Sequence, residues 1–229
     1  MSQLPKAFIF DLDGVITDTA EYHFLAWKAL AEELGISIDR AFNEDLKGIS
    51  RLESLERILA LDPSKVTMST EKKEYYANQK NEHYKKLIES IGPKDILPGI
   101  EALLKEIKLN GIKIALGSAS KNAHAVLGQL GLTHYFDYIV DAANISKGKP
   151  NPETFLVAAD GVTVPAKECI GVEDAVAGVQ AINDAGMFSV AIGPQEQFPN
   201  ANMRIDNTVE LNFNGIISRF AEWNKNGEV

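Results

Sequence analysis

The chain of 229 residues carries 23 Lys and Arg against 32 Asp and Glu, a formal charge of −9, and 45% of it is hydrophobic. This composition allows a packed core and excludes wholesale disorder, and the acidic balance argues against a nucleic-acid-binding protein, whose affinity depends on Lys and Arg contacts to phosphate. The single cysteine, Cys169, excludes an intramolecular disulfide and a cysteine-built metal site.

The N-terminal segment predicts a buried strand. The sequence MSQLPKAFIF lacks the basic start and the longer apolar core of a signal peptide, and no apolar run in the chain has the length of a membrane span. The short apolar run Ala7–Phe10 ends at Asp11 and predicts a strand. We therefore expect a cytoplasmic protein that acts without nucleic-acid or membrane partners.

Residues 17–92 contain three or four helical patterns and no convincing strand. Gly35 is expected to end the first helix as a left-handed C-cap. The third pattern, around Glu71–Ile91, is rich in Lys, Glu and Tyr and predicts a helix with a solvated face, while Asp62–Thr70 predicts a loop. The apolar faces of the first and second helices are expected at Phe24, Trp27, Leu30 and Leu34, and at Leu52, Leu55, Ile58 and Leu59.

Beyond Pro93, four more apolar runs predict strands at residues 112–116, 138–140, 169–172 and 189–192. Short strands that alternate with helices indicate a mainly parallel sheet covered on both faces. We predict an α/β core domain of residues 1–16 and 93–229, with residues 17–92 inserted as an all-helical cap domain on two hinges. Ligands of such sheets bind beyond the carboxyl ends of the strands.

Polar side chains follow four of these strands. Asp11-Leu12-Asp13-Gly14 follows the first, and in extended backbone its two carboxylates point the same way. Ser118 follows the second strand, Lys149 follows the third, and Glu173-Asp174 ends the fourth. Four acids at one sheet edge repel unless a cation neutralises them, and oxygen ligands without His or Cys favour Mg²⁺. With a lysine and a serine added, the set predicts a site for a phosphoryl group.

Structural roles compete with this interpretation at each position. The acids at a strand end also occur in solvated turns, and an acidic pair often marks a helix start. Arg51 also reads as a helix-start cation, and Ser50–Glu53 matches a capping box. Trp27 is expected mainly as cap packing. Two lysines lie near the expected phosphate, and Lys149 is preferred over Lys147 because it directly precedes Pro150.

Together, FIFDLDGVITDT, Ser118, Lys149-Pro150 and GVEDA resemble the four motifs of the haloacid dehalogenase superfamily. The run Asp11–His23, the segment Leu46–Arg51 and the segment Ser118–Asn122 resemble, within it, the β-phosphoglucomutase family. The likeness extends from about residue 6 to 195. It implies a Rossmann-like parallel sheet with an inserted helical cap.

The resemblance also implies roles for residues at the sheet edge. Asp11 would be the nucleophile that becomes an aspartyl phosphate, and Asp13 the general acid–base that also contacts substrate. Ser118 and Lys149 would stabilise the transferring phosphoryl group. One Mg²⁺ would be held by the carboxylates of Asp11, Glu173 and Asp174 and by the main-chain carbonyl of Asp13. Thr19 and His23 would be hinge and support residues.

The remaining implied residues bind the sugar and its second phosphate: Lys47, Gly48, Ile49, Arg51, Lys80, Ser120, Lys121 and Asn122. The implied reaction interconverts β-D-glucose 1-phosphate and glucose 6-phosphate through a β-glucose 1,6-bisphosphate intermediate, with glucose 1,6-bisphosphate as primer, in an enzyme expected to be a monomer. Two alternatives stay open. A phosphatase acting on a small sugar phosphate needs the same core, and a binding protein derived from a dead enzyme has no need of the intact acid set.

Overall fold

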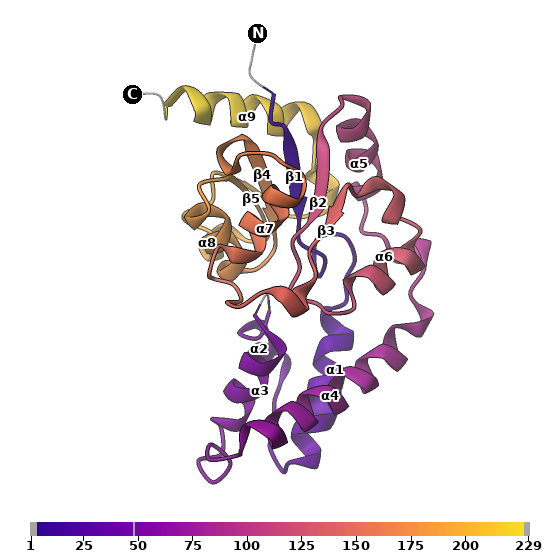
Figure 1. Cartoon of the computed structure of the whole chain (residues 1–229), viewed down its shortest axis with the longest axis vertical. Helices are drawn as coiled ribbons and strands as arrows, with labels where there is room; N and C mark the ends of the chain where they lie inside the picture. Colours follow the sequence, from indigo (N-terminus) through magenta and orange to yellow (C-terminus); the bar gives the residue numbers. More distant parts are fainter. Residues whose placement is uncertain (1–3, 48, 227–229) are drawn as a thin grey trace.

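The computed structural model describes residues 4–47 and 49–226, and its centre is a six-stranded sheet in which every pairing is parallel. The strand order is β3-β2-β1-β4-β5-β6 (Figure 1). The strands are β1 (Ala7–Phe10), β2 (Lys113–Leu116), β3 (Tyr138–Ile139), β4 (Cys169–Glu173), β5 (Phe188–Ile192) and β6 (Met203–Ile205). The five strands expected from sequence are confirmed to within one residue at each end. Strand β6 was not predicted, because three residues with a central Arg204 show no apolar pattern.

Helices cover both faces of this sheet, as β1 shows residue by residue. Phe8 and Phe10 pack into one core with α5 (Ile100–Leu109), α6 (Ala123–Leu130) and α9 (Phe213–Asn226). Ala7 and Ile9 pack into the other with α7 (Glu153–Gly161) and α8 (Val176–Asp184). A strand buried on both faces lacks a polar side, which explains why AFIF is apolar throughout.

Four helices lie between β1 and α5 and form a separate lobe in Figure 1. They are α1 (Ala20–Glu33), α2 (Arg40–Glu44), α3 (Arg51–Leu59) and α4 (Thr70–Leu87). They share their own apolar cluster, which includes Phe24, Trp27, Leu30, Leu55 and Ile58. Gly35, at φ +74°, follows α1 as the left-handed residue that was expected. No helix in the described part of the chain is both long and apolar enough to span a membrane.

One expectation about these helices needs correction. Leu52 is 37% exposed, because at 100° per residue it lies at the edge of the stripe formed by Leu55, Ile58 and Leu59. The solvated face expected for α4 is confirmed at residues such as Glu74 and Asn78, while Lys80, 3% exposed, and Tyr84, fully buried, lie on its other side. The loop expected at residues 62–70 is confirmed except for Thr70, which begins α4.

The two segments that connect the lobe to the sheet run side by side. Thr17 forms isolated bridges with Asp13 and with Ile96, and its hydroxyl donates a 2.7 Å hydrogen bond to the carbonyl oxygen of Asp95. The entry and exit of the helical segment are thereby paired at one place. This arrangement suits a hinge, although the division into domains at residues 17 and 92 stays a prediction.

Candidate active site

The expected polar residues meet at the carboxyl edge of the sheet. Asp11 directly follows β1, Glu173 is the last residue of β4, and Ser118 lies two residues beyond β2. All three are almost fully buried, and Lys149, from the loop before α7, is fully buried among them. The parallel topology therefore gathers four residues that are far apart in sequence.

Lys149 lies between two carboxylates. Its Nζ is 2.6 Å from Asp11 Oδ1 and 3.5 Å from Glu173 Oε2, and it also lies 4.8 Å from the centre of the Phe155 ring. These carboxylates raise the pKa of Lys149 although burial lowers it, so the lysine stays charged. Lys147 is exposed, and its backbone N–H donates to Glu153. Lys149 is therefore the lysine of this loop that reaches the acids.

Asp11, Glu173 and Asp174 form a cluster suited to a divalent cation. One carboxylate oxygen from each lies within 4.8 Å of the others. Both Glu173 oxygens are buried without a hydrogen-bond partner. Burial first, and then Asp11, raise the pKa of Glu173 well above its ordinary value, and the same causes raise the pKa of Asp174 to about 7. Three carboxylates face one ammonium, so the donor set and its charge fit a hard cation such as Mg²⁺.

Asp13 lies two residues beyond Asp11 and has a raised pKa. Burial, followed by the charges of Asp11 and Asp174, raises its pKa to about 8. Its Oδ1 atom is buried and accepts no hydrogen bond, and its Oδ2 is 3.7 Å from His23 Nε2. At neutral pH, most of Asp13 therefore holds a proton that it can give to an oxygen atom in the cavity.

A chain of buried groups from α1 and α4 supports Asp13. Lys80 Nζ is 2.8 Å from His23 Nδ1, and the His23 ring packs on Tyr84 with 4.0 Å between ring centres. Burial lowers the pKa of His23 well below its usual value and that of Lys80 to about 7, with further lowering from nearby cations. A neutral His23 that accepts from Lys80 at Nδ1 carries its proton on Nε2, which faces Asp13.

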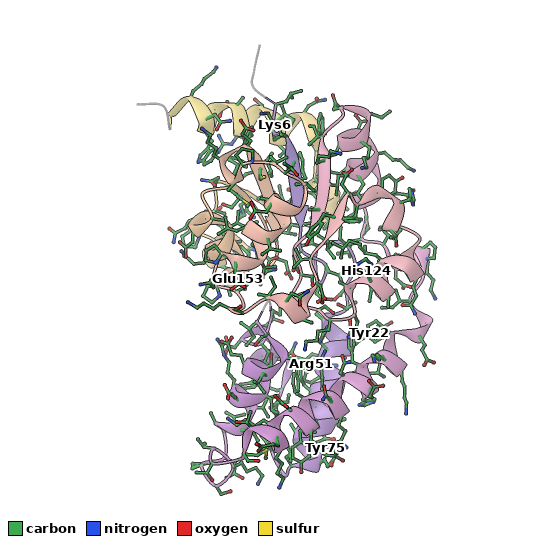
Figure 2. All side chains as sticks on the ribbon, in the orientation of Figure 1. Lys6, Tyr22, Arg51, Tyr75, His124 and Glu153 are labelled. Carbon is green, nitrogen blue, oxygen red and sulfur yellow. The ribbon has the colours of Figure 1, made fainter. Side chains whose placement is uncertain are left out.

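These residues border a cavity of about 800 Å³, partly open to solvent, between the helical lobe and the sheet. Figure 2 shows Arg51 at the end of the lobe that lies nearest the sheet. Lys47, also on the lobe, pairs with Glu44 at 2.9 Å and lies 3.9 Å from Asp174. The expected residues that line the cavity are Asp11, Asp13, His23, Lys47, Ile49, Arg51, Lys80, Ser118, Ser120, Lys121, Asn122 and Asp174.

Three of the expected residues that the structure describes do not line the cavity. Lys149 and Glu173 are buried among the acids without lining the cavity, and Thr19 is buried at the residue before α1. Gly48 lies outside the described residues. Sequence reasoning missed several lining residues, because their exposure to the cavity depends on how the helices pack: Ala20, Asn43, Leu46, Ser54, Asn81 and Ala119. Trp27, expected as packing, both packs in the lobe and lines the cavity. For one of the missed lining residues the sequence holds a signal: Ser54 is a polar residue beside Leu55 on the apolar face of its helix.

A substitution at Gly178 tests the acid cluster without replacing any of the proposed metal ligands. A Cβ atom at this position of α8 would lie 1.9 Å from Glu173 Oε1 and 2.3 Å from its Cγ, so Gly178→Ala must displace the whole Glu173 side chain. We expect the affinity for Mg²⁺ to fall about 10- to 100-fold, the range for disturbed supporting shells. Isothermal titration with Mg²⁺ measures it.

Gly128→Ala, at a helical glycine in α6 with nothing near its Cβ, is the matched control. It should leave the affinity unchanged and raise stability by about 0.5–1 kcal/mol through helix propensity. Equal Mg²⁺ affinities for the two variants would show that Glu173 is not a ligand.

Comparison with known proteins identifies the family. The model of the family described as haloacid dehalogenase-like hydrolase matches residues 5–186. The chain is 47% identical over 206 residues to a β-phosphoglucomutase of Bacillus subtilis, covering 90% of this chain and 91% of that protein. It is 32% identical over 185 residues to a fructose-1-phosphate phosphatase of Escherichia coli, covering 80% of this chain and 94% of that protein.

A crystal structure of β-phosphoglucomutase from Clostridium difficile superposes with a TM-score of 0.95 at 52% identity, covering 97% of this chain and all of that one. This match extends across both the helical lobe and the sheet. The chain therefore belongs to the haloacid dehalogenase-like hydrolase family, in the group that includes the β-phosphoglucomutases.

Proposed function

We propose that this chain is a β-phosphoglucomutase that interconverts β-D-glucose 1-phosphate and glucose 6-phosphate. The observation that carries the proposal is a pair of carboxyl groups with opposite properties at one end of the cavity. Asp11 is held at 2.6 Å by the ammonium of Lys149, whereas the pKa of Asp13 is raised to about 8. One is thus equipped to attack phosphorus as an anion and the other to transfer a proton. Identities of 47% and 52% to two β-phosphoglucomutases support this assignment.

In the proposed reaction, a carboxylate oxygen of Asp11 forms a bond to phosphorus while the bond from phosphorus to the leaving oxygen breaks. Asp13 gives its proton to that oxygen. The reverse transfer, with Asp13 as base, carries the phosphoryl group from Asp11 to the 6-hydroxyl of β-glucose 1-phosphate and forms β-glucose 1,6-bisphosphate. This intermediate then gives its 1-phosphoryl group to Asp11 by the first step and leaves as glucose 6-phosphate. Glucose 1,6-bisphosphate would prime the cycle by phosphorylating Asp11.

Several groups offset the repulsion between Asp11 and the incoming phosphate. Lys149 supplies a buried positive charge, and Ser118 supplies a hydroxyl that lines the same cavity as Asp11. Mg²⁺, held by the carboxylates of Asp11, Glu173 and Asp174 and by the main-chain carbonyl of Asp13, would neutralise charge that develops on the phosphoryl oxygens.

We assign the second phosphate and the sugar to residues on both sides of the cavity. Arg51, with a guanidinium fork, suits the phosphate that is not reacting. Residues 17–92 would act as a cap domain that excludes water from phosphorylated Asp11 during turnover. Thr19 and His23 would support Asp13, and further substrate contacts are assigned to Lys47, Ile49, Lys80, Ser120, Lys121 and Asn122.

A phosphatase for a small sugar phosphate is the second candidate, supported by the 32% identity to the fructose-1-phosphate phosphatase. The two functions are separated by following inorganic phosphate and glucose 6-phosphate from β- and α-glucose 1-phosphate, with Mg²⁺ and with or without a trace of glucose 1,6-bisphosphate. We expect bisphosphate-dependent isomer formation from the β-anomer. Phosphate release as the main product would contradict the mutase assignment.

The acid cluster also predicts a pH-dependent response to Mg²⁺. The pKa values of Glu173 and Asp174 are raised by folding, so in the metal-free protein their contribution to stability is present below the unfolded pKa and is lost as pH rises toward about 7. Mg²⁺ replaces these protons. We expect a larger increase in thermal midpoint on adding Mg²⁺ at about pH 8 than at about pH 5.5.

Measurements in EDTA and in excess Mg²⁺ at both pH values give this difference. The pKa shifts of His23 and Lys80 affect the stability of the metal-free and the Mg²⁺-bound protein alike. Their contribution therefore largely cancels from the increase in thermal midpoint. An Mg²⁺ effect independent of pH would mean that the buried acids do not bind the ion.

A further inference from the structure

Helix α4 places two neighbouring side chains at the cavity with different partners. Lys80 contacts His23, which faces Asp13. Asn81 instead accepts a 2.8 Å hydrogen bond at Oδ1 from Nδ2 of Asn122, which directly precedes α6. Within residues 4–47 and 49–226, this is the one hydrogen bond between a side chain of helices α1–α4 and a side chain of the sheet part. Asn81 therefore connects the two parts of the molecule directly.

From Asn122 the hydrogen bonds continue to the reacting centre. The backbone N–H of Asn122 donates to Ser120 Oγ at 3.3 Å, and the backbone N–H of Ser120 donates to Ser118 Oγ at 3.1 Å. Asn122 is 8% exposed and Ser118 is 1% exposed, so water competes little for these contacts. A continuous path thus leads from α4 to the hydroxyl of Ser118, which lines the cavity together with Asp11.

The side chain of Asn122 does not cap the helix that follows it. An asparagine before a helix normally accepts a hydrogen bond from the first turn of that helix. Here Asn122 makes no such capping bond, and its amide group points to Asn81. Its contact is one that exists only while the lobe lies against the sheet.

We propose that Asn81 is a positioning residue: by accepting the Asn122 amide hydrogen, it fixes the loop Ser118–Asn122 in its ligand-binding conformation when the helical lobe closes. Closure and phosphate binding are thereby coupled through one hydrogen bond. The choice of sugar phosphate as ligand rests on the proposed function, whereas the coupling holds for any phosphorylated ligand that fills the cavity.

A double-mutant cycle of Asn81→Ala and Asn122→Ala tests this role. Asn81→Ala is expected to raise KM for β-glucose 1-phosphate about 3- to 10-fold, the equivalent of one partly buried hydrogen bond, and Asn122→Ala is expected to raise it further because it also removes a proposed substrate contact. The double variant should match the larger single effect, because both changes remove the same bond. A larger share of phosphoryl groups should also pass to water instead of sugar. Asn78→Ala, at an exposed residue of the same helix, is the matched control.

Additive effects on KM would overturn the proposal, since they would mean that Asn81 and Asn122 act separately. So would an Asn81→Ala variant with the KM and product ratio of the control. If the unchanged protein releases phosphate and forms no glucose 6-phosphate, the mutase proposal fails, and the cycle is then measured on KM for phosphate release. If the unchanged protein is a mutase and the cycle shows no coupling, only the role of Asn81 is wrong.

Discussion

Replacing Asp11 with Asn is expected to lower kcat by about 10⁴- to 10⁶-fold, the range for loss of a catalytic nucleophile. The amide keeps the size of the side chain but cannot attack phosphorus, and it removes one anionic oxygen from the acid cluster. Steady-state turnover of β-glucose 1-phosphate measures the loss. Trapping of the phosphoryl group on acid-denatured enzyme should succeed with the unchanged protein and fail with the variant.

The Asp11→Asn variant is expected to lose activity without losing stability. Asp11 is one of three clustered acids, and in Asp11→Asn Lys149 still faces Glu173 at 3.5 Å. The thermal midpoint in EDTA is therefore expected to stay the same or to rise. Asp160→Asn, at an exposed carboxylate of α7, should leave turnover unchanged. Turnover of Asp11→Asn within tenfold of the unchanged protein would exclude Asp11 as the nucleophile.

The sheet and the acids at its edge could be predicted because both depend on local sequence. A four-residue apolar run such as Ala7–Phe10 has few ways to bury both faces other than a central parallel strand. Once strands are parallel, residues that follow them share an edge, which places Asp11 near Asp174 without knowledge of the helices. Strand β6 was missed because an edge strand needs fewer apolar residues.

The helical side of the cavity could not be predicted in the same way. Whether a residue of α4 faces solvent or the cavity depends on the rotation of that helix against α1 and the sheet. The Lys- and Glu-rich sequence indicated a solvated face, and only the family resemblance singled out Lys80, which is buried between the rings of Trp27 and Tyr84. Nothing near Asn81 in the sequence points to its partner 41 residues away. These contacts are tertiary, so residue type alone does not reveal them.

Replacing Lys149 with Met should impair both activity and metal-free stability, because its ammonium pairs with both Asp11 and Glu173. Methionine fills a similar volume without charge, so Asp11 and Glu173 lose their shared partner. Loss of a buried partner of this kind destabilises by about 3–5 kcal/mol. Because the unpaired acids take up protons, the loss should be largest above about pH 7 and smaller in excess Mg²⁺.

The effect on the reaction is separate from the effect on stability. Without the ammonium, Asp11 loses its 2.6 Å partner and the phosphoryl oxygens lose a fixed positive charge, so kcat should fall about 10²- to 10³-fold or more even at saturating Mg²⁺. Lys147→Met is the matched control two residues away: Lys147 is exposed, and its backbone rather than its ammonium contacts Glu153. It should change stability by less than about 0.5 kcal/mol and leave kcat within about twofold. An inactive Lys147→Met variant together with an active Lys149→Met variant would contradict this prediction. It would mean that Lys147, not Lys149, supplies the charge that assists phosphoryl transfer.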